Sequence, residues 1–263
     1  MELARAKPGE VRLLARENSL RDETAGVCLG YAQANLVILP KDLAYDFLLF
    51  CTRNPKPCPL LEATDVGSFE PVIMAPGADL RTDIARFRIY RNGEPAEEVD
   101  SIVEYWRDDF VAFLLGCSVT FEEALLNKGI PVRHLEEGRG VTPMYKTNIE
   151  CKPAGGFRGP MVVSMRPIPY DRISETIMTT ARFPRVHGAP VHVGDPRIIG
   201  IADLDSTDYG VPVRINEGEV PIFWACGVTP QAVALVSRPE IMITHVPGHM
   251  FITDVLNEQL ATF

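Results

Sequence analysis

The stretch FVAFLLGCSVTFEEALLN, residues 110–127, decides the fold class. Its opening residues Phe110–Leu115 are all apolar, which is typical of a strand buried on both faces, and a loop of small residues follows them. Phe121–Asn127 suits a helix, and Thr120 with Glu123 has the T-x-x-E spacing of a capping box, a pattern that marks a helix start. A strand–loop–helix unit of this kind predicts an α/β fold.

A second segment, near the carboxyl end, has the same organisation. Pro221–Ala225 is apolar, and Pro230 stands at the first position of the predicted helix after it, where a missing N–H costs nothing. The loops also align, since Gly116–Thr120 and Ala225–Thr229 both read small-Cys-small-Val-Thr. We therefore expect two equivalent βα units in one sheet of parallel strands, with the site where the carboxyl ends of those strands meet.

Other segments predict further elements. Near the amino end we expect a helix after Pro40 with Asp42 as its N-cap, and before it a helix that rests on apolar residues at helical spacing, namely Ala25, Leu29, Ala32 and Leu36. The pair Asn92-Gly93 predicts a hairpin between a strand over 85–91 and a short return strand.

The region 131–216 differs in composition from the chain on either side of it. It is rich in Pro and Gly, with a predicted strand at Met161–Met165 and a predicted helix at Ile173–Arg182. We interpret it as an inserted smaller α+β domain. Residues 1–130 and 217–263 then form a discontinuous main α/β domain.

Composition excludes several classes of protein. Of the 263 residues 46% are hydrophobic and 23% charged, as in a globular domain with a sizeable core. The net charge of -9 and the lack of any run of Lys and Arg argue against nucleic acid as a partner. The longest uncharged run, 220–237, contains Gly227 and Pro230, so we expect no membrane span. The amino end has no secretory segment and the six cysteines form no CxxC pair, so we expect a cytoplasmic protein with reduced thiols.

The two predicted helix starts are candidate binding sites for an acidic small molecule. Free backbone N–H groups there attract carboxylates, so we expect substrate contacts from Ser118 and Thr120 at one start and from Gly227 and Thr229 at the other. The alternative is that both threonines only cap their helices. Cys117 and Cys226 stand where a helix dipole lowers a thiol pKa, which makes them candidate nucleophiles, although buried cysteines more often only pack.

Histidines gather in two short segments rich in Gly and Pro, 187–192 and 245–249. Loop histidines beside Gly and Pro suit acid–base catalysis or substrate contact, so we expect such roles for His187, His192, His245 and His249, with purely structural roles as the alternative. A zinc site at the last two would need a helix, and Pro247-Gly248 argues against one, so we expect no metal.

Positive and polar side chains complete the candidate substrate contacts, namely Arg81 with Asp83, Arg166, and Asn35 on a predicted apolar helix. Each of these arginines also suits a structural or solvated role. The chain has none of the patterns GxGxxG, GxxxxGK[ST], GxSxG or HExxH, so we expect no organic cofactor.

Seven segments in order along the chain together resemble the D-glutamate cyclase family of bacterial proteins, also named hydro-lyases. These segments are Gly30–Asn35, Asp79–Asp83, Gly116–Ser118, Val162–Pro167, His187–His192, Phe223–Gln231 and Thr244–Met250. The last but one adds Gln231 to the candidate substrate contacts. The resemblance implies a larger three-layer α/β/α unit with a smaller two-layer unit, and dehydration of a small acid, with cyclisation of D-glutamate to 5-oxo-D-proline as the best candidate.

Two other functions stay open at this stage. One is a non-catalytic protein that binds a small dicarboxylate or a lactam, and the other is a metal-dependent hydrolase. The sequence does not set the oligomeric state, for which a homodimer is one expectation.

Overall fold

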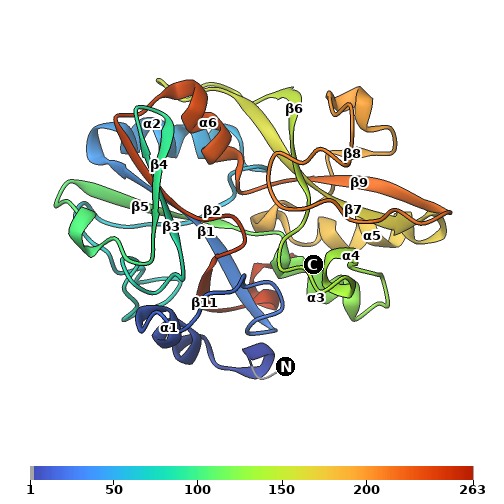
Figure 1. The fold of residues 1–263 in the computed structure, drawn as a ribbon, viewed down its shortest axis with the longest axis horizontal. Coiled ribbons are helices and arrows are strands. Elements are labelled where there is room, and N and C mark those ends of the chain that lie inside the picture. The colour runs from blue at the N-terminus through green and yellow to red at the C-terminus, as the bar shows by residue number, and fades with distance from the viewer. Residues whose placement is uncertain (1–2, 263) are drawn as a thin grey trace.

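Two β-sheets lie side by side in a computed structural model that describes residues 3–262 (Figure 1). The larger sheet has the order β2-β5-β1-β10-β3-β4, and β11 pairs with β1. Its strands are β1 (Tyr31–Pro40), β2 (Leu60–Ala63), β3 (Phe87–Arg91), β4 (Glu94–Val99), β5 (Phe110–Gly116), β10 (Ile241–His245) and β11 (Phe251–Leu256). The smaller sheet has the order β6-β7-β9-β8, with strands β6 (Met144–Glu150), β7 (Pro160–Pro169), β8 (His192–Val193) and β9 (Glu219–Ala225).

Helices pack on both sheets. The α-helices are α1 (Pro8–Arg16), α2 (Lys41–Arg53), α3 (Val119–Leu126), α4 (Arg133–Glu136), α5 (Ile173–Ala181) and α6 (Thr229–Ser237). Short 3-10 helices are η1 (Leu3–Arg5), η2 (Val103–Tyr105), η3 (Tyr170–Arg172), η4 (Pro184–Val186), η5 (Pro196–Ile199) and η6 (Asn257–Leu260). Together with the two sheets, these helices confirm the predicted two-part α/β fold.

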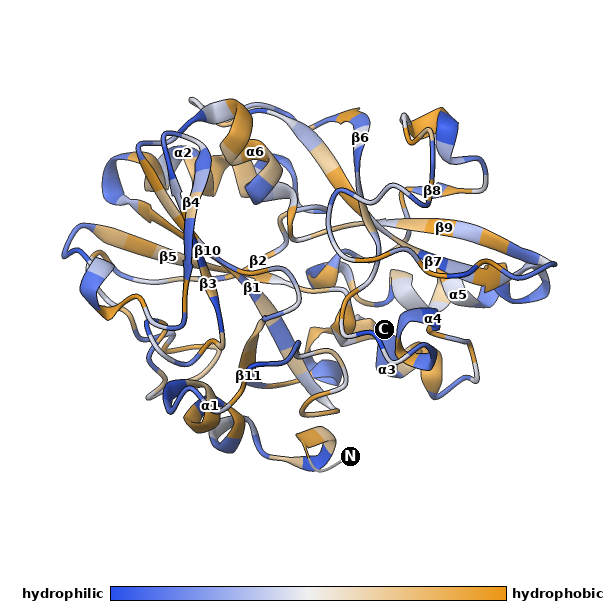
Figure 2. Ribbon diagram, in the orientation of Figure 1, coloured by the Kyte–Doolittle hydropathy of each residue, from blue (hydrophilic) through white to orange (hydrophobic). Residues whose placement is uncertain are grey.

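Strand β1 runs through the middle of the larger sheet and serves two cores. Its even-numbered residues, such as Leu36 and Ile38, join a core that extends to α3 and the smaller sheet, while Val37 and Leu39 join a core with Phe47 of α2 and with α6. Figure 2 shows apolar colour along β5 of the larger sheet and over much of β9 of the smaller one. Because both faces of β1 are covered, its sequence has no clean alternation.

This double burial explains a wrong prediction. The helix expected over 25–36 is not formed, because Gly26 and Gly30 have φ angles of 79° and 93° and the chain from Tyr31 onward is strand. Apolar residues at nearly every position of a buried strand also occur at helical spacing. The helix after Pro40 is confirmed, but it begins at Lys41, so Asp42 is not its N-cap.

The predicted parallel sheet is also wrong. Every paired strand in the described residues runs antiparallel to its neighbours, and β5 and β9, which precede the two matching loops, belong to different sheets. The pairing of β9 with β7 places residues 219–225 in the smaller sheet, whereas we expected them in the main domain. The other domain limits stay predictions.

Several local predictions are confirmed. The hairpin β3–β4 turns at Asn92-Gly93, whose positive φ angles of 50° and 83° suit a type I′ turn. Strands are present at 110–116 and 160–169, and α5 covers the predicted helix from Ile173. No helix among residues 3–262 has the length and apolar character needed to cross a membrane.

Candidate active site

The two matching cysteine loops meet at one cavity between the sheets. Cys117 and Ser118, after β5, line it together with Cys226, after β9. Asn35 of β1 and His245 at the end of β10 complete its polar wall. The expectation that both loops reach one site is therefore confirmed, although the strands that carry them belong to separate sheets.

Asn35 holds the two loops at a fixed spacing. Its Nδ2 donates to the Gly116 carbonyl at 2.9 Å, and a Cβ placed on Gly227 would lie 2.0 Å from the same nitrogen. Gly116 in turn is pressed against η4, since a Cβ there would lie 2.0 Å from the Arg185 carbonyl oxygen. Both glycines are therefore required by close contact.

The His245 side chain lies at a gap between two strand pairings of β1. Strand β1 pairs with β11 up to Ala34 and with β10 from Val37, so the Leu36 N–H between them is free to donate to His245 Nδ1, at 3.1 Å. The Leu36 carbonyl is farther from Nδ1, at 3.5 Å, so we assign the ring proton to Nε2. Nε2 is buried and has no partner among the described residues. Burial lowers the pKa of His245 to about 4, which makes the ring neutral at pH 7.

Both cavity cysteines are protonated. Burial raises the pKa of Cys117 to about 12 and that of Cys226 to about 11, although backbone N–H groups at the helix starts and the Arg166 guanidinium oppose the shift. The Cys226 thiol lies 3.3 Å from the sulfur of Met144. The expected lowering of these pKa values by the helix dipoles is therefore wrong, because the loss of hydration outweighs it.

A buried charged network supports Ser118. Arg166 donates to Ser118 Oγ at 3.0 Å and to Ser164 Oγ at 3.1 Å, and forms an ion pair with Glu122. His134 Nε2 lies 3.4 Å from the second oxygen of Glu122. Burial alone would raise the pKa of Glu122, but His134 and Arg166 hold it at about 2, so this carboxylate stays ionised.

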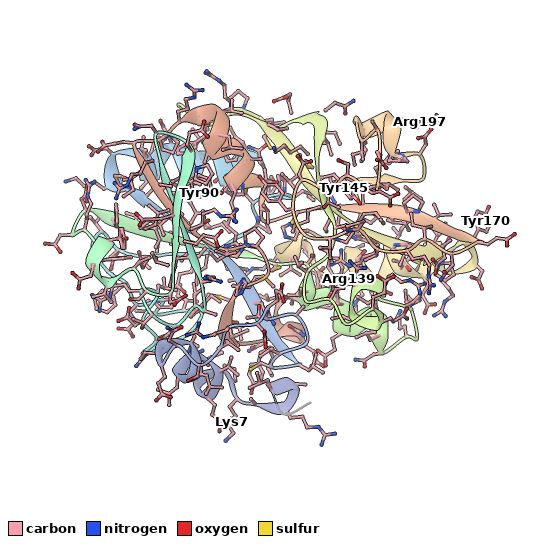
Figure 3. The ribbon with its side chains drawn as sticks, viewed as in Figure 1. Lys7, Tyr90, Arg139, Tyr145, Tyr170 and Arg197 are labelled. Atoms are coloured by element: carbon pink, nitrogen blue, oxygen red, sulfur yellow. The ribbon has the colours of Figure 1, made fainter. Side chains whose placement is uncertain are left out.

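The cavity is small. Its volume of about 30 Å³ holds water but not a five-carbon acid, so the wall must move when a ligand enters. Gly140 and Gly248 line it, and Glu23 packs against both from outside, since a Cβ on Gly140 would lie 2.4 Å from Glu23 Cβ. The neighbouring Arg139 lies near the middle of the view, between the two sheets (Figure 3).

Comparison with known proteins shows the family of this chain. The D-glutamate cyclase family model matches residues 111–254. A protein of Thermoanaerobacter sp. (strain X514), named "Putative hydro-lyase", is 67% identical over 97% of this chain and 96% of its own. The chain belongs to the D-glutamate cyclase family.

Other relatives in the D-glutamate cyclase family bear the same hydro-lyase name. The protein of Stutzerimonas stutzeri is 63% identical over 96% of this chain and 95% of its own, and that of Bacillus subtilis is 59% identical over 97% and 98%. Among solved structures, a nitrogen repressor-like protein from Methanococcus jannaschii aligns with a TM-score of 0.40 at 10% identity, covering 94% of each chain. We draw nothing from a likeness this weak.

In this D-glutamate cyclase family member, Thr120 and Thr229, which we expected to contact substrate, form hydrogen bonds within the protein instead. Thr229 Oγ1 donates to the Cys226 carbonyl at 2.7 Å and accepts from the Val162 N–H at 3.0 Å. Thr120 Oγ1 accepts from the Gln33 N–H at 3.3 Å, so the predicted capping box is not formed. Neither Thr120 nor Thr229 lines the cavity.

Three other predicted substrate contacts lie away from the cavity. Gln231 Nε2 donates to the His245 carbonyl at 3.0 Å and its oxygen accepts from Tyr90, so it positions His245 from behind. Figure 3 shows Tyr90 in the larger sheet, beneath α6. Arg81 pairs with Asp79 at 2.8 Å and lies over the ring of Phe69, while Asp83 pairs with Arg16. Arg166 reaches the cavity only through Ser118.

The other three predicted histidines do not line the cavity. Buried His187 Nδ1 lies 2.6 Å from the Lys56 carbonyl, and His192 Nε2 lies 2.7 Å from the Asp195 carbonyl at the edge of the smaller sheet. His249 Nε2 lies 3.3 Å from the Arg21 carbonyl. Among residues 3–262 no three His, Cys, Asp or Glu side chains are arranged to hold a metal ion.

The sequence analysis missed Glu122 and His134. Glu122 follows Phe121 in a helix with few charges, and His134 stands apart from the two segments that hold the other four histidines. A charged residue inside an apolar stretch is a usable signal, since such residues are seldom buried without a partner. Its partners, however, come from distant parts of the chain.

Proposed function

We propose that this protein removes water from a small acidic amino acid, with the cyclisation of D-glutamate to 5-oxo-D-proline as its reaction. The convergence of two helix starts, Asn35 and His245 on one cavity is the observation that carries the proposal. Membership of the D-glutamate cyclase family supports the substrate class, and the hydro-lyase names of the relatives support the loss of water.

The reaction requires the site to bind the substrate in a curled conformation. The α-amine must lie against the γ-carboxyl carbon, which costs conformational entropy that binding has to offset. One helix start, at Ser118, would hold the α-carboxylate, and the other, at Gly227, would face the γ-carboxyl group. Closure of the lactam removes two protons from the α-ammonium, and both go to the γ-carboxylate oxygen that leaves, so the products are the lactam and water.

His245 is the group placed to stabilise the developing oxyanion. Its ring is neutral and carries its proton on Nε2, so it acts as a hydrogen-bond donor. A preorganised donor in a site without bulk water typically contributes a rate factor of about 10²–10³. Asn35, already bound to the Gly116 carbonyl, keeps the loops at the spacing that this geometry needs.

Separate incubations with D-glutamate and 5-oxo-D-proline, followed by chiral chromatography, test the proposal. We expect interconversion of the two compounds by the wild-type protein. His245→Asn keeps an acceptor for the Leu36 N–H and removes the Nε2 donor, so it should lower kcat by about 10²–10³ with little change in stability.

Two results would contradict the proposal. Binding of 5-oxo-D-proline by calorimetry without turnover of either compound would favour a binding protein. Unchanged turnover in folded His245→Asn would remove His245 from the mechanism. The matched control is Cys151→Ala, a substitution at a buried residue that does not line the cavity.

A further inference from the structure

Two thiols face one cavity from two different sheets. Cys117 follows β5 of the larger sheet and stands two residues before α3, and Cys226 follows β9 of the smaller sheet and stands three residues before α6. Backbone N–H groups of the same loops, at Val119 in one case and at Gly227 and Val228 in the other, favour the thiolate form of each cysteine. Oxyanion stabilisation by His245 requires neither thiol, so the mechanism above leaves this pairing unexplained.

We propose that the cavity also exchanges the α-hydrogen of its amino acid, with Cys117 and Cys226 acting on opposite faces of the α-carbon. The result is inversion of the α-carbon, so the activity is that of an amino-acid racemase. This inference rests on the proposed function in one respect, namely that the same small amino acid enters the cavity.

The step balances with two thiols and no further reagent. One cysteine starts as a thiolate after losing its proton to solvent. Its sulfur takes the α-hydrogen as a proton, and the electron pair of the C–H bond moves into the carboxylate to give an enediolate. The other thiol then gives its proton to the opposite face of the α-carbon and is left as the thiolate.

Groups at the cavity can stabilise both the enediolate and the thiolate that this step requires. The Nε2 of His245 is buried and has no partner within residues 3–262, so it can donate to an oxygen of the enediolate, where negative charge develops. The N–H groups at the two helix starts and the Arg166 guanidinium favour a thiolate on either cysteine. These groups offset part of the cost of ionising a buried thiol.

The pairing of the loops favours proton transfer over covalent catalysis. A nucleophilic cysteine needs one thiol and a base, whereas proton transfer to both faces of a carbon needs two equivalent groups on opposite sides. The matching sequences 116–120 and 225–229 supply two such groups in the same local setting. Their placement on separate sheets lets them approach the ligand from different directions.

Incubation of the wild-type protein in D₂O with D-glutamate, and separately with 5-oxo-D-proline, tests the inference. Proton NMR follows deuterium at the α-carbon, and chiral chromatography follows the enantiomers and the lactam. We expect deuterium to enter first in the newly formed L-enantiomer, because the thiol on the far face delivers a solvent-derived deuteron.

Single variants assign the two thiols. Cys117→Ala and Cys226→Ala should each lower the rate of racemisation by at least about 100-fold, whereas Cys151→Ala should leave it unchanged. Absence of α-deuterium in both compounds with the wild-type protein overturns the inference, whether or not lactam forms. Racemisation without formation of lactam would support the racemase inference and would contradict the proposed cyclisation.

Discussion

Asn35 and Gly227 are in direct contact, and this contact joins the two sheets at the cavity. Asn35 stands on β1 of the larger sheet, while Gly227 follows β9 of the smaller one. The Asn35 amide fills the space where a side chain at position 227 would begin, and it binds the loop of Cys117 through the Gly116 carbonyl. One amide group therefore sets the distance between the two cysteine loops.

Gly227→Ala should separate the loops. Its Cβ would lie 2.0 Å from Asn35 Nδ2, so either the loop or the amide must shift. We expect kcat/KM for the amino acid to fall at least about tenfold, because a shift near 1 Å at a reacting centre can cost up to about 100-fold. Steady-state kinetics measure the effect.

The matched control is Gly156→Ala, since a Cβ at position 156 meets nothing within 4 Å. Wild-type kinetics in folded Gly227→Ala would show that the spacing of the loops does not matter for activity.

Glu122→Gln should destabilise the protein strongly. The substitution leaves the Arg166 guanidinium, which is 1% exposed, without its carboxylate. Breaking a buried ion pair by removing one partner typically costs about 3–5 kcal/mol in unfolding free energy. Urea unfolding at pH 7 measures this loss.

Asp195→Asn is the comparison for Glu122→Gln, because the Asp195–Arg197 pair is solvent-exposed and should matter little. Equal stability changes in the two variants would contradict a structural role for the buried network.

Mild acid should destabilise the protein through two neutral histidines. Burial lowers the pKa of His187 and of His245 to about 4, below the value of 6.5 for an exposed ring. Because the folded-state pKa lies below the unfolded one, each contribution is complete above pH 6.5 and is lost as the pH falls toward 4. We expect a loss of about 2 kcal/mol per histidine between pH 7 and pH 5.

Urea unfolding at both pH values checks this expectation. His187→Asn retains a donor for the Lys56 carbonyl and suits the positive φ of 83° at this position, but it does not titrate. It should therefore lose less stability on acidification than the wild type does. An identical pH dependence in the two proteins would contradict a neutral buried His187.

Local signals in the sequence predicted the cysteine loops well. The apolar run 110–115, the small loop residues and the helix after them follow from interactions within about ten residues of chain. The same holds for the Asn92-Gly93 hairpin, where the turn itself demands those residues.

The features that the sequence did not predict depend on contacts between residues far apart in the chain. The direction of each strand depends on its pairing, and β1 pairs with β5, β10 and β11, which lie far along the chain. The contact of His245 with Leu36 depends on that same pairing and spans 209 positions. The raised thiol pKa values depend on burial between two sheets, which the helix-start pattern does not reveal.

Cys226→Ala should retain the cyclisation of D-glutamate. A thioester route needs the sulfur of Cys226 to attack the γ-carboxylate of the substrate. Even as a thiolate it is a poor nucleophile toward an unactivated carboxylate, whereas stabilisation of the oxyanion by His245 does not involve the thiol. We expect the lactam to form within about tenfold of the wild-type rate, with only the α-hydrogen exchange lost. Chiral chromatography measures the lactam, and mass spectrometry of the wild-type protein quenched during turnover searches for an acyl adduct. Complete loss of lactam in folded Cys226→Ala, together with an adduct on Cys226 in the wild type, would replace the non-covalent cyclisation with the covalent one.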